Sequence, residues 1–354
     1  MLRSLLSAQK LATLVVPHAR RLNRRQSSAT APPPNCALPA ILWTKHVQAL
    51  YRYYNSQFGA LWAMIDREQL CAVDNRHAVG ANNAISTDQR LLNDHLAIRT
   101  LSLPGISLDD LHNTLLCIGF KERQMLRFPE KHLRARWYAP PNGVHWLPRL
   151  FVSELLVDEL SGGTRDRLER LTAQRRSMRQ TTGTAFRHHP AFDNTLYSDT
   201  PRSALALQFA QEMQHSLLSA PLQRKDYEAV ARESDYGAWT LINGNRVNHC
   251  TIPVHLMQAP FDSLERFMAH ASEQWGVEFF NNGAVQRSAD ELLLQSSTPA
   301  QQIDYQFADE RAPSKVPGSF VEFIERHREG FDVANAARIF ESTDNGSISN
   351  KKTH

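Results

Sequence analysis

The order of strand-like and helical segments repeats once along this chain, and this repetition constrains the fold more than any other feature. The first series is a strand, a helix and two strands, at residues 94–103, 107–118, 133–138 and 149–155. The second is a strand, a helix and three strands, at residues 246–254, 261–274, 291–296, 303–307 and 319–326. The two series share an order of elements rather than a sequence. They therefore predict an internal structural duplication within an α+β fold.

Helices are predicted both inside and outside the two series. Ser107 followed by Asp110 is typical of a capping box, and Gly119 suits the position after the last turn of that helix. One or two helices are expected between residues 41 and 67, where apolar residues recur at helical spacing. Three more fall within a charge-rich stretch, at residues 166–178, 203–218 and 226–233. We interpret that stretch, about residues 157–233, as a helical insertion.

Residues 1–35 differ from the rest of the chain in their charge. They hold six of the 40 basic residues and no acid, and the first acidic residue is Asp66. Without these six, 34 basic residues face 36 acidic ones, so the body offers no basic surface for nucleic acid. An Arg-rich, acid-free start followed by the proline run at 32–34 predicts an organelle transit peptide and linker. The mitochondrion is the first choice of destination and the plastid the alternative; a basic tail without a targeting role is the other interpretation.

One domain, residues 36–345, is predicted to follow the leader, with a disordered polar tail at 346–354. No apolar run approaches the roughly 18 residues that span a bilayer, which argues against an integral membrane protein. The four cysteines form no CxxC pair, which argues against a zinc ribbon or a disulfide framework.

Three of the strand-like segments each carry one side chain that can bind a metal. The segments are 94–99 (DHLAIR), 248–253 (NHCTIP) and 320–326 (FVEFIER), and the side chains are His95, His249 and Glu322. Two neutral imidazoles and one carboxylate fill one face of an octahedron and leave three adjacent positions open. That ligand set is typical of the Fe(II) sites at which oxygen and a substrate bind side by side.

Strand geometry predicts which neighbours share a face with these side chains. Because side chains alternate along a strand, Ala97 and Arg99 lie on the face of His95, while Leu96 and Ile98 lie on the opposite face. The same alternation places Thr251 and His255 with His249, and Phe320 and Arg326 with Glu322.

The chemistry of these residues alone leaves other interpretations open. A histidine in a strand is more often a hydrogen-bonded core residue than a ligand. Glu322 could be a surface or salt-bridged residue, and Glu325 competes with it for the role of ligand. In favour of the metal, an ionised carboxylate on an otherwise apolar strand is costly to bury without a partner, and a cation would supply one.

Longer motifs around these segments resemble a known family. They are 94–100 (DHLAIRT), 147–155 (LPRLFVSEL), 236–239 (YGAW), 248–249 (NH), 316–326 (VPGSFVEFIER), 330–331 (GF) and 339–343 (IFEST). In this order, with matches over about residues 45–343, they resemble the family of domain of unknown function 1338, which is associated with 2-oxoadipate dioxygenase/decarboxylase. The resemblance implies a vicinal-oxygen-chelate fold, in which paired βαβββ modules form an incomplete barrel around a metal.

The C-terminal end is also similar to 4-hydroxyphenylpyruvate dioxygenase, in which a Phe-x-Glu strand precedes a Gly-Phe turn and a final helix. That family uses the same ligand set and also acts on an α-keto acid. Its Gly-Phe-Gly-x-Gly-Asn-Phe turn is replaced here by GFDVANA at residues 330–336. This departure counts against an aromatic substrate.

The family resemblance also implies a reaction and a role for each site residue. Fe(II) held by His95, His249 and Glu322 would bind the α-keto dicarboxylate 2-oxoadipate and O2. The products would be 2-hydroxyglutarate and CO2, a step of lysine degradation. Arg99, on the face of His95, is expected to bind the distal carboxylate of the substrate, with Ser342 as a weaker substrate contact.

Several alternatives remain at this stage. Arg149 and Arg326 could bind substrate or hold the fold together, and Asn248 is expected to orient a metal ligand. Another α-keto-acid dioxygenase, or a glyoxalase-like lyase or isomerase, could use the same fold, and glyoxalase-like sites usually have four protein ligands. The non-enzymatic alternative is a metal-free scaffold.

Overall fold

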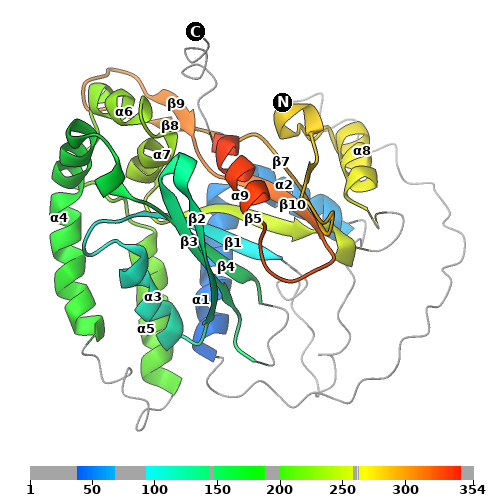
Figure 1. The fold of residues 1–354 in the computed structure, drawn as a ribbon, viewed down its shortest axis with the longest axis horizontal. Coiled ribbons are helices and arrows are strands. Elements are labelled where there is room, and N and C mark those ends of the chain that lie inside the picture. Colours follow the sequence, from blue (N-terminus) through cyan, green and yellow to red (C-terminus); the bar gives the residue numbers. More distant parts are fainter. Residues whose placement is uncertain are drawn as a thin grey trace, which may run out of the picture. The chain divides into compact units, whose positions relative to one another are not determined.

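The computed structural model describes residues 38–67, 93–142, 147–187, 199–257, 261 and 263–343 (Figure 1). The leader at 1–35 and the tail at 346–354 lie outside the described residues, so both stay predictions. Within the described ranges, no helix is both long and apolar enough to cross a bilayer.

An eight-stranded sheet forms the centre of the fold. Its strands are β1 (His95–Leu101), β2 (Lys121–Phe128), β3 (Leu133–Ala139), β4 (Arg149–Leu155), β5 (Val247–Pro253), β6 (Gln286–Arg287), β7 (Leu293–Ser297) and β10 (Phe320–Arg326). Across the sheet their order is β2-β3-β4-β1-β5-β10-β7-β6. Strands β1 to β4 therefore occupy one half of the sheet, and β5, β6, β7 and β10 occupy the other half.

Each half of the sheet belongs to one βαβββ unit. In the first unit, α3 (Leu108–Cys117) follows β1 and precedes β2, β3 and β4. In the second unit, α8 (Leu264–Trp275) follows β5 and precedes β6, β7 and β10. β1 pairs with β4, and β5 with β10, in parallel, whereas the other neighbours within a unit are antiparallel. The units meet at the antiparallel pair of β1 and β5, so the predicted structural duplication is confirmed.

The helices of the two units begin in the same way. Ser107 caps α3 and accepts a hydrogen bond from the backbone N–H of Asp110, which completes the predicted capping box. Ser263 caps α8 and accepts from the backbone N–H of Arg266. Each serine satisfies a backbone donor that the first turn of a helix otherwise leaves unpaired.

A glutamate from the last strand of each unit stabilises the same helix start. The backbone N–H of Leu108 donates to Glu154 Oε1 at 2.7 Å, and that of Leu264 donates to Glu325 Oε2 at 2.8 Å. Both carboxylates are buried, and their negative charge lies at the positive end of a helix dipole. Glu154 of β4 and Glu325 of β10 are therefore equivalent positions of the two units.

The sheet has an apolar core on each side. One core contains α1 (Leu38–Tyr54), α2 (Ser56–Arg67), α3, α5 (Asp199–Met213) and α8, together with Leu96 and Ile98 of β1. The other contains α4 (Gly162–Arg187), α6 (Arg224–Ala231), α7 (Asp235–Asn243) and α9 (Val333–Ile339), together with Ala97. The predicted alternation along β1 is confirmed.

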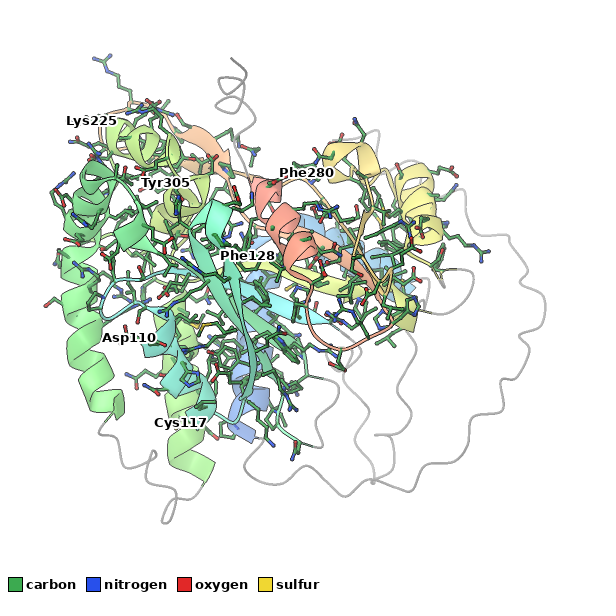
Figure 2. The ribbon with its side chains drawn as sticks, viewed as in Figure 1. Asp110, Cys117, Phe128, Lys225, Phe280 and Tyr305 are labelled. Atoms are coloured by element: carbon green, nitrogen blue, oxygen red, sulfur yellow. The ribbon has the colours of Figure 1, made fainter. Side chains whose placement is uncertain are left out.

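The sheet curls so that its two edges approach one helix. α9, red in Figure 1, contacts the edge strand β2 of the first unit and also β6 and β7 at the opposite edge. Phe128 at the end of β2, labelled in Figure 2, lies with its ring 5.3 Å from that of Phe340 in the 3-10 turn η10 (Phe340–Thr343). Two edges that meet the same helix make the sheet an incomplete barrel.

The differences from the predicted elements lie away from the central strands. The sequence does not predict β2, because the strand is charge-rich and only Leu126 and Phe128 in it are buried. The helical insertion does not end at residue 233, since α7 (Asp235–Asn243) follows and is buried along most of its length. β8 (Gln302–Tyr305) pairs with β9 (Ser314–Pro317) in a separate two-stranded sheet instead of joining the second unit.

Candidate metal centre

The three predicted ligands converge at the middle of the sheet. His95 Nε2 lies 3.4 Å from His249 Nε2, and Glu322 Oε2 lies 3.0 Å from the first of these atoms and 3.3 Å from the second. All three residues are buried on the face of the sheet that carries Ala97. Three strands that are distant in the sequence therefore place one ligand atom each at a single point.

The residue before each histidine fixes the orientation of the imidazole. Asp94 Oδ2 lies 2.9 Å from His95 Nδ1, and Asn248 Oδ1 lies 3.1 Å from His249 Nδ1. When Nδ1 donates to these oxygens, the lone pair of each Nε2 is left to face the centre. The contact confirms the expected placement of Asn248 beside a ligand.

The arrangement fits one divalent cation. Ligand atoms at about 2.1 Å from one ion lie roughly 3 Å from each other, and the separations observed here are 3.0 to 3.4 Å. Two Nε2 lone pairs and a carboxylate oxygen that face one another repel unless a positive charge lies between them. A proton would satisfy one of these pairs, whereas a metal ion accepts all three.

The electrostatics of the centre favour a bound cation. Burial lowers the pKa of His249, so this imidazole is neutral and able to act as a ligand. Burial opposes the ionisation of Glu322, but the adjacent His95 and His249 hold the pKa of its carboxyl below the usual range. Burial also disfavours charge on His95, yet Glu322 and Asp94 raise its pKa and so attract positive charge to this point.

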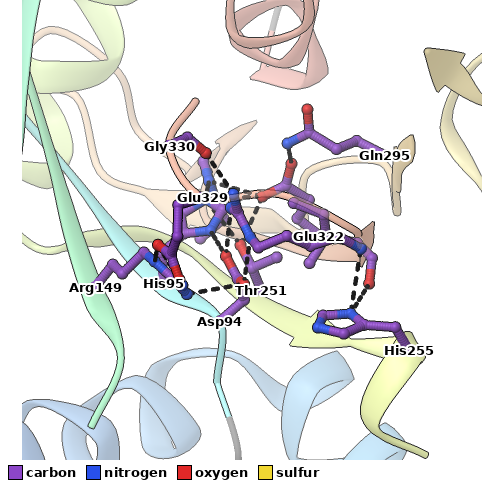
Figure 3. Close-up of polar contacts among 12 residues, drawn as sticks. Asp94, His95, Arg149, Thr251, His255, Gln295, Glu322, Glu329 and Gly330 are labelled. Carbon is purple, nitrogen blue, oxygen red and sulfur yellow. Dashed lines mark hydrogen bonds and ion pairs between the residues drawn. The ribbon is translucent and has the colours of Figure 1, made fainter. Parts of the chain in front are cut away.

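An ion-pair network around the buried carboxylate of Asp94 supports the first histidine. Arg326 holds Asp94 with two hydrogen bonds, from Nε to Oδ1 at 2.7 Å and from Nη2 to Oδ2 at 2.8 Å (Figure 3). Arg149 Nη1 donates to the same carboxylate at 3.2 Å and pairs with Glu329 through Nη2. Burial opposes the charge on Asp94, but Arg326 holds the pKa of that carboxyl well below its usual range. Arg149 and Arg326 thus position Asp94, and through it His95.

The duplication shows why three candidate ligands, and not four, lie at this point. Glu322 precedes Glu325 by three residues, so its equivalent in the first unit is the residue three before Glu154, which is Phe151. The strand register agrees, because Glu322 pairs with the residue two after His249 and Phe151 pairs with the residue two after His95. An apolar ring stands where a fourth ligand would lie.

Glu325 does not compete with Glu322. Alternation turns Glu325 to the opposite face of β10, where it accepts from the first residue of α8 and lies 2.7 Å from His327 Nε2. Glu322, and not Glu325, therefore lies beside the two histidines, and its role as a ligand stays a prediction.

Aromatic side chains enclose the centre. The ring of Phe331 lies 4.9 Å from that of His95 and 4.9 Å from that of Phe151. The ring of Phe320 lies 4.6 Å from that of His249. Apolar walls exclude water and strengthen the electrostatic interactions of the ligands.

Arg99 lies on the expected face of β1 and is 1% exposed. Its guanidinium lies over the rings of Tyr236 at 4.7 Å and Trp239 at 5.0 Å, and Nη2 donates to the carbonyl of Phe340 at 3.4 Å. Aromatic faces stabilise a buried cation without neutralising its charge. The side chain of Ser342 lies outside the described part of the structure, so its predicted role is not tested.

Comparison with known proteins identifies the family of this chain. Residues 44–328 match the family model described as 2-oxoadipate dioxygenase/decarboxylase. This chain belongs to that family. It is 35% identical over 284 residues to the chloroplastic 2-oxoadipate dioxygenase/decarboxylase of Arabidopsis thaliana, which covers 72% of this chain and 69% of the relative.

Solved structures of the family's fold agree with the description above. A hydroxyglutarate synthase from Oryza sativa, in complex with 2-oxoadipate, matches with a TM-score of 0.68 and 26% identity, over 93% of this chain and 100% of that chain. A glyoxalase superfamily protein from Ralstonia eutropha matches with a TM-score of 0.57 and 20% identity, over 92% and 95% of the two chains, and shows the fold alone. The predicted vicinal-oxygen-chelate fold is confirmed.

Two further residues contact Glu322, and the sequence predicts no role for either. Thr251 Oγ1 donates to Glu322 Oε2 at 2.6 Å and lies 3.1 Å from His95 Nε2. Gln295 Nε2 donates to Glu322 Oε1. The role of Thr251 could have been predicted, because alternation along the strand places it on the same face as His249. The role of Gln295 could not, because it depends on the register of β7 against β10, which the sequence does not reveal.

Proposed function

We propose that this protein is an Fe(II)-dependent dioxygenase that converts 2-oxoadipate and O2 to 2-hydroxyglutarate and CO2. The observation that carries the proposal is the convergence of His95, His249 and Glu322 in a chain of the 2-oxoadipate dioxygenase/decarboxylase family. The complex of the rice relative with 2-oxoadipate supports the choice of substrate. Two imidazoles and one carboxylate are the ligands that Fe(II) oxygenases use, which supports the choice of metal.

Different residues of this chain would have different roles around the metal. Bound Fe(II) would supply adjacent positions for a chelating keto acid and O2 and the electrons for oxygen activation. His95 and His249 hold neutral imidazoles toward it, because Asp94 and Asn248 occupy the other ring nitrogens. Glu322 supplies one negative charge, and the surrounding phenylalanines exclude water from the reacting groups.

We assign the distal carboxylate of the substrate to Arg99. The guanidinium is buried on the face of His95, and a planar fork of donors can hold a carboxylate with two parallel hydrogen bonds. Arg99→Ala is expected to retain iron while the KM for 2-oxoadipate rises roughly 10- to 100-fold, the loss of one charged hydrogen-bonded contact. Arg99→Lys keeps the charge but not the fork and is expected to be intermediate. Unchanged selectivity for dicarboxylic keto acids in Arg99→Ala would move this role to another residue.

The test of the function is oxygen uptake by iron-loaded protein with a panel of keto acids that differ in chain length and in the distal group. We expect uptake and CO2 release to be fastest with 2-oxoadipate. His249→Ala is expected to show neither, since two ligands do not retain Fe(II) in this geometry. Equal turnover by the wild type and His249→Ala would reject the ligand assignment, and a preference for a monocarboxylic keto acid would reject the substrate.

The position of Phe151 favours this function over a glyoxalase-like lyase or isomerase. Such sites usually complete their coordination with a second carboxylate, whereas here the equivalent residue cannot bind a metal. Open coordination positions are what a chelating substrate and O2 together require.

We further propose that residues 1–35 direct import into an organelle. The name of the Arabidopsis relative includes "chloroplastic", which favours the plastid over the mitochondrion as the destination. Fusion of residues 1–35 to a fluorescent protein, imaged with markers of both organelles, tests this. Fluorescence that remains in the cytosol would reject targeting by the leader.

A further inference from the structure

The two carboxylate oxygens of Glu322 have different surroundings. Oε2 faces the imidazoles of His95 and His249, at 3.0 and 3.3 Å, and also accepts a hydrogen bond from Thr251 Oγ1 at 2.6 Å. Oε1 accepts a hydrogen bond from Gln295 Nε2 (Figure 3). Gln295 is 5% exposed and Glu322 is fully buried, so this contact is shielded from competing water. Each oxygen therefore accepts a hydrogen bond, and Oε2 is the one turned toward the two imidazoles.

The register of the sheet places Gln295 at this point. β7 runs antiparallel to β10, with Glu322 opposite Ser297 and Ile324 opposite Gln295. Gln295 is thus the diagonal neighbour of Glu322 on the same face, and diagonal neighbours are within reach of long side chains. A glutamine spans that distance, and its amide is a donor that carries no charge.

The chemistry of a carboxylate ligand gives this contact a consequence. A carboxylate binds a metal through one oxygen or through both. The hydrogen bond from Gln295 engages a lone pair of Oε1 and holds the carboxylate in the rotation that turns Oε2 toward the imidazoles, which favours binding through Oε2 alone. Because the donor is a neutral amide, the carboxylate keeps its full charge. We propose that Gln295 is a positioning residue that restricts Glu322 to binding the metal through Oε2.

The restriction determines how many positions remain for substrate, and in this respect the inference rests on the proposed function. With one oxygen from Glu322 and two imidazoles, three of six octahedral positions stay open. A keto acid that chelates through two oxygens then leaves one for O2. If Glu322 bound through both oxygens, the keto acid would take the last two positions and O2 would have none.

The experiment counts water molecules on Mn(II) bound to the protein, from the broadening of its electron paramagnetic resonance lines in ¹⁷O-enriched water. Wild-type protein is expected to show about three bound waters, and Gln295→Met about two. Methionine has a similar length and no donor. Gln302→Met, at an exposed position of β8, is the matched control and is expected to behave as the wild type.

Gln295→Asn serves as a second variant if Gln295→Met does not fold, since its shorter amide stays polar but falls short of the carboxylate. Three waters on Mn(II) in the folded variants would overturn the inference. Complete loss of Mn(II) binding would also overturn it, because the residue would then support the site as a whole.

The outcome is separable from that of the proposed function. If the water counts differ as expected but the wild type does not oxidise 2-oxoadipate, the proposed function fails while the role of Gln295 stands. If the wild type oxidises 2-oxoadipate and the counts are equal, the reverse holds. With iron, the kcat of Gln295→Met is expected to fall about 10- to 100-fold, as for other residues that orient a metal ligand.

Discussion

The two βαβββ units share a topology but contribute unequally to the metal centre. The first unit supplies His95, whereas the second supplies both His249 and Glu322. Phe151 occupies the place in the first unit that Glu322 occupies in the second. The absence of a fourth candidate ligand at this point is therefore a property of one strand position and not of the fold.

The units also differ in how they hold their histidines. In the first unit the residue before the histidine is Asp94, which is itself held by Arg326 and Arg149. In the second unit it is Asn248, a neutral amide. The first histidine is therefore fixed by a charged network and the second by a single neutral hydrogen bond.

Among substitutions that make the two units more alike, the largest effect on turnover is expected at the position of a fourth ligand. Phe151→Glu would place a second carboxylate beside the metal and occupy one of the positions that substrate and O2 need. We expect turnover of 2-oxoadipate to fall by at least about 1,000-fold, a loss of several kcal/mol of transition-state stabilisation. Metal content, measured by elemental analysis, is expected to stay near that of the wild type.

Phe151→Leu is the control for that substitution, because it changes the packing but adds no ligand. Its turnover is expected to stay within about tenfold of the wild type, given that volume changes between apolar residues cost on the order of 1–2 kcal/mol. Normal turnover by Phe151→Glu would show that the two strand positions are not equivalent.

A smaller effect is expected from exchanging the residues that hold the histidines. Asp94→Asn gives the first unit the neutral partner of the second and is expected to weaken metal binding about 10- to 100-fold. Asn248→Asp gives the second unit the charged partner and is expected to tighten binding. Calorimetric titration of both variants with Mn(II) measures the two effects.

Asp94→Asn also removes the charge that Arg326 faces, so a loss of stability accompanies it. Removing one partner of a buried ion pair lowers the free energy of unfolding by about 3–5 kcal/mol, because the other charge is left unpaired. Asn248→Asp breaks no ion pair, so a change in its affinity for metal is easier to interpret. Weaker metal binding by Asn248→Asp would contradict the role given to the residue before each histidine.

The smallest effect on turnover is expected at the helix starts. Glu154→Gln and Glu325→Gln each remove the negative charge from the N-terminus of a helix and are expected to reduce the free energy of unfolding by about 1–2 kcal/mol. Glu154→Gln is expected to cost more, because Glu154 also pairs with Arg134. Chemical denaturation measures both, and a change of turnover with either would indicate a second role.

The sequence predicts the central strands and the convergence of the three candidate ligands better than the residues around them. The period-two pattern places His95, His249 and Glu322 on faces of their own strands, and alternation separates Glu322 from Glu325 once the strand is known. Those features are local, so they can be predicted from the sequence of a single strand.

The remaining features depend on register between distant strands. The pairing of Asp94 with Arg326 joins residues 232 positions apart, and the contact of Gln295 with Glu322 depends on how β7 pairs with β10. The sequence does not predict β2 for a related reason, because an exposed edge strand needs few apolar residues. None of these three features can be predicted from the sequence of one segment alone.

The proposed metal site can be observed by diffraction at the iron absorption edge from crystals grown anaerobically with Fe(II). We expect one anomalous peak per chain, about 2.0–2.2 Å from His95 Nε2, His249 Nε2 and one oxygen of Glu322, with no fourth protein ligand. A peak elsewhere, or a metal without these three side chains around it, would rule out the ligand set.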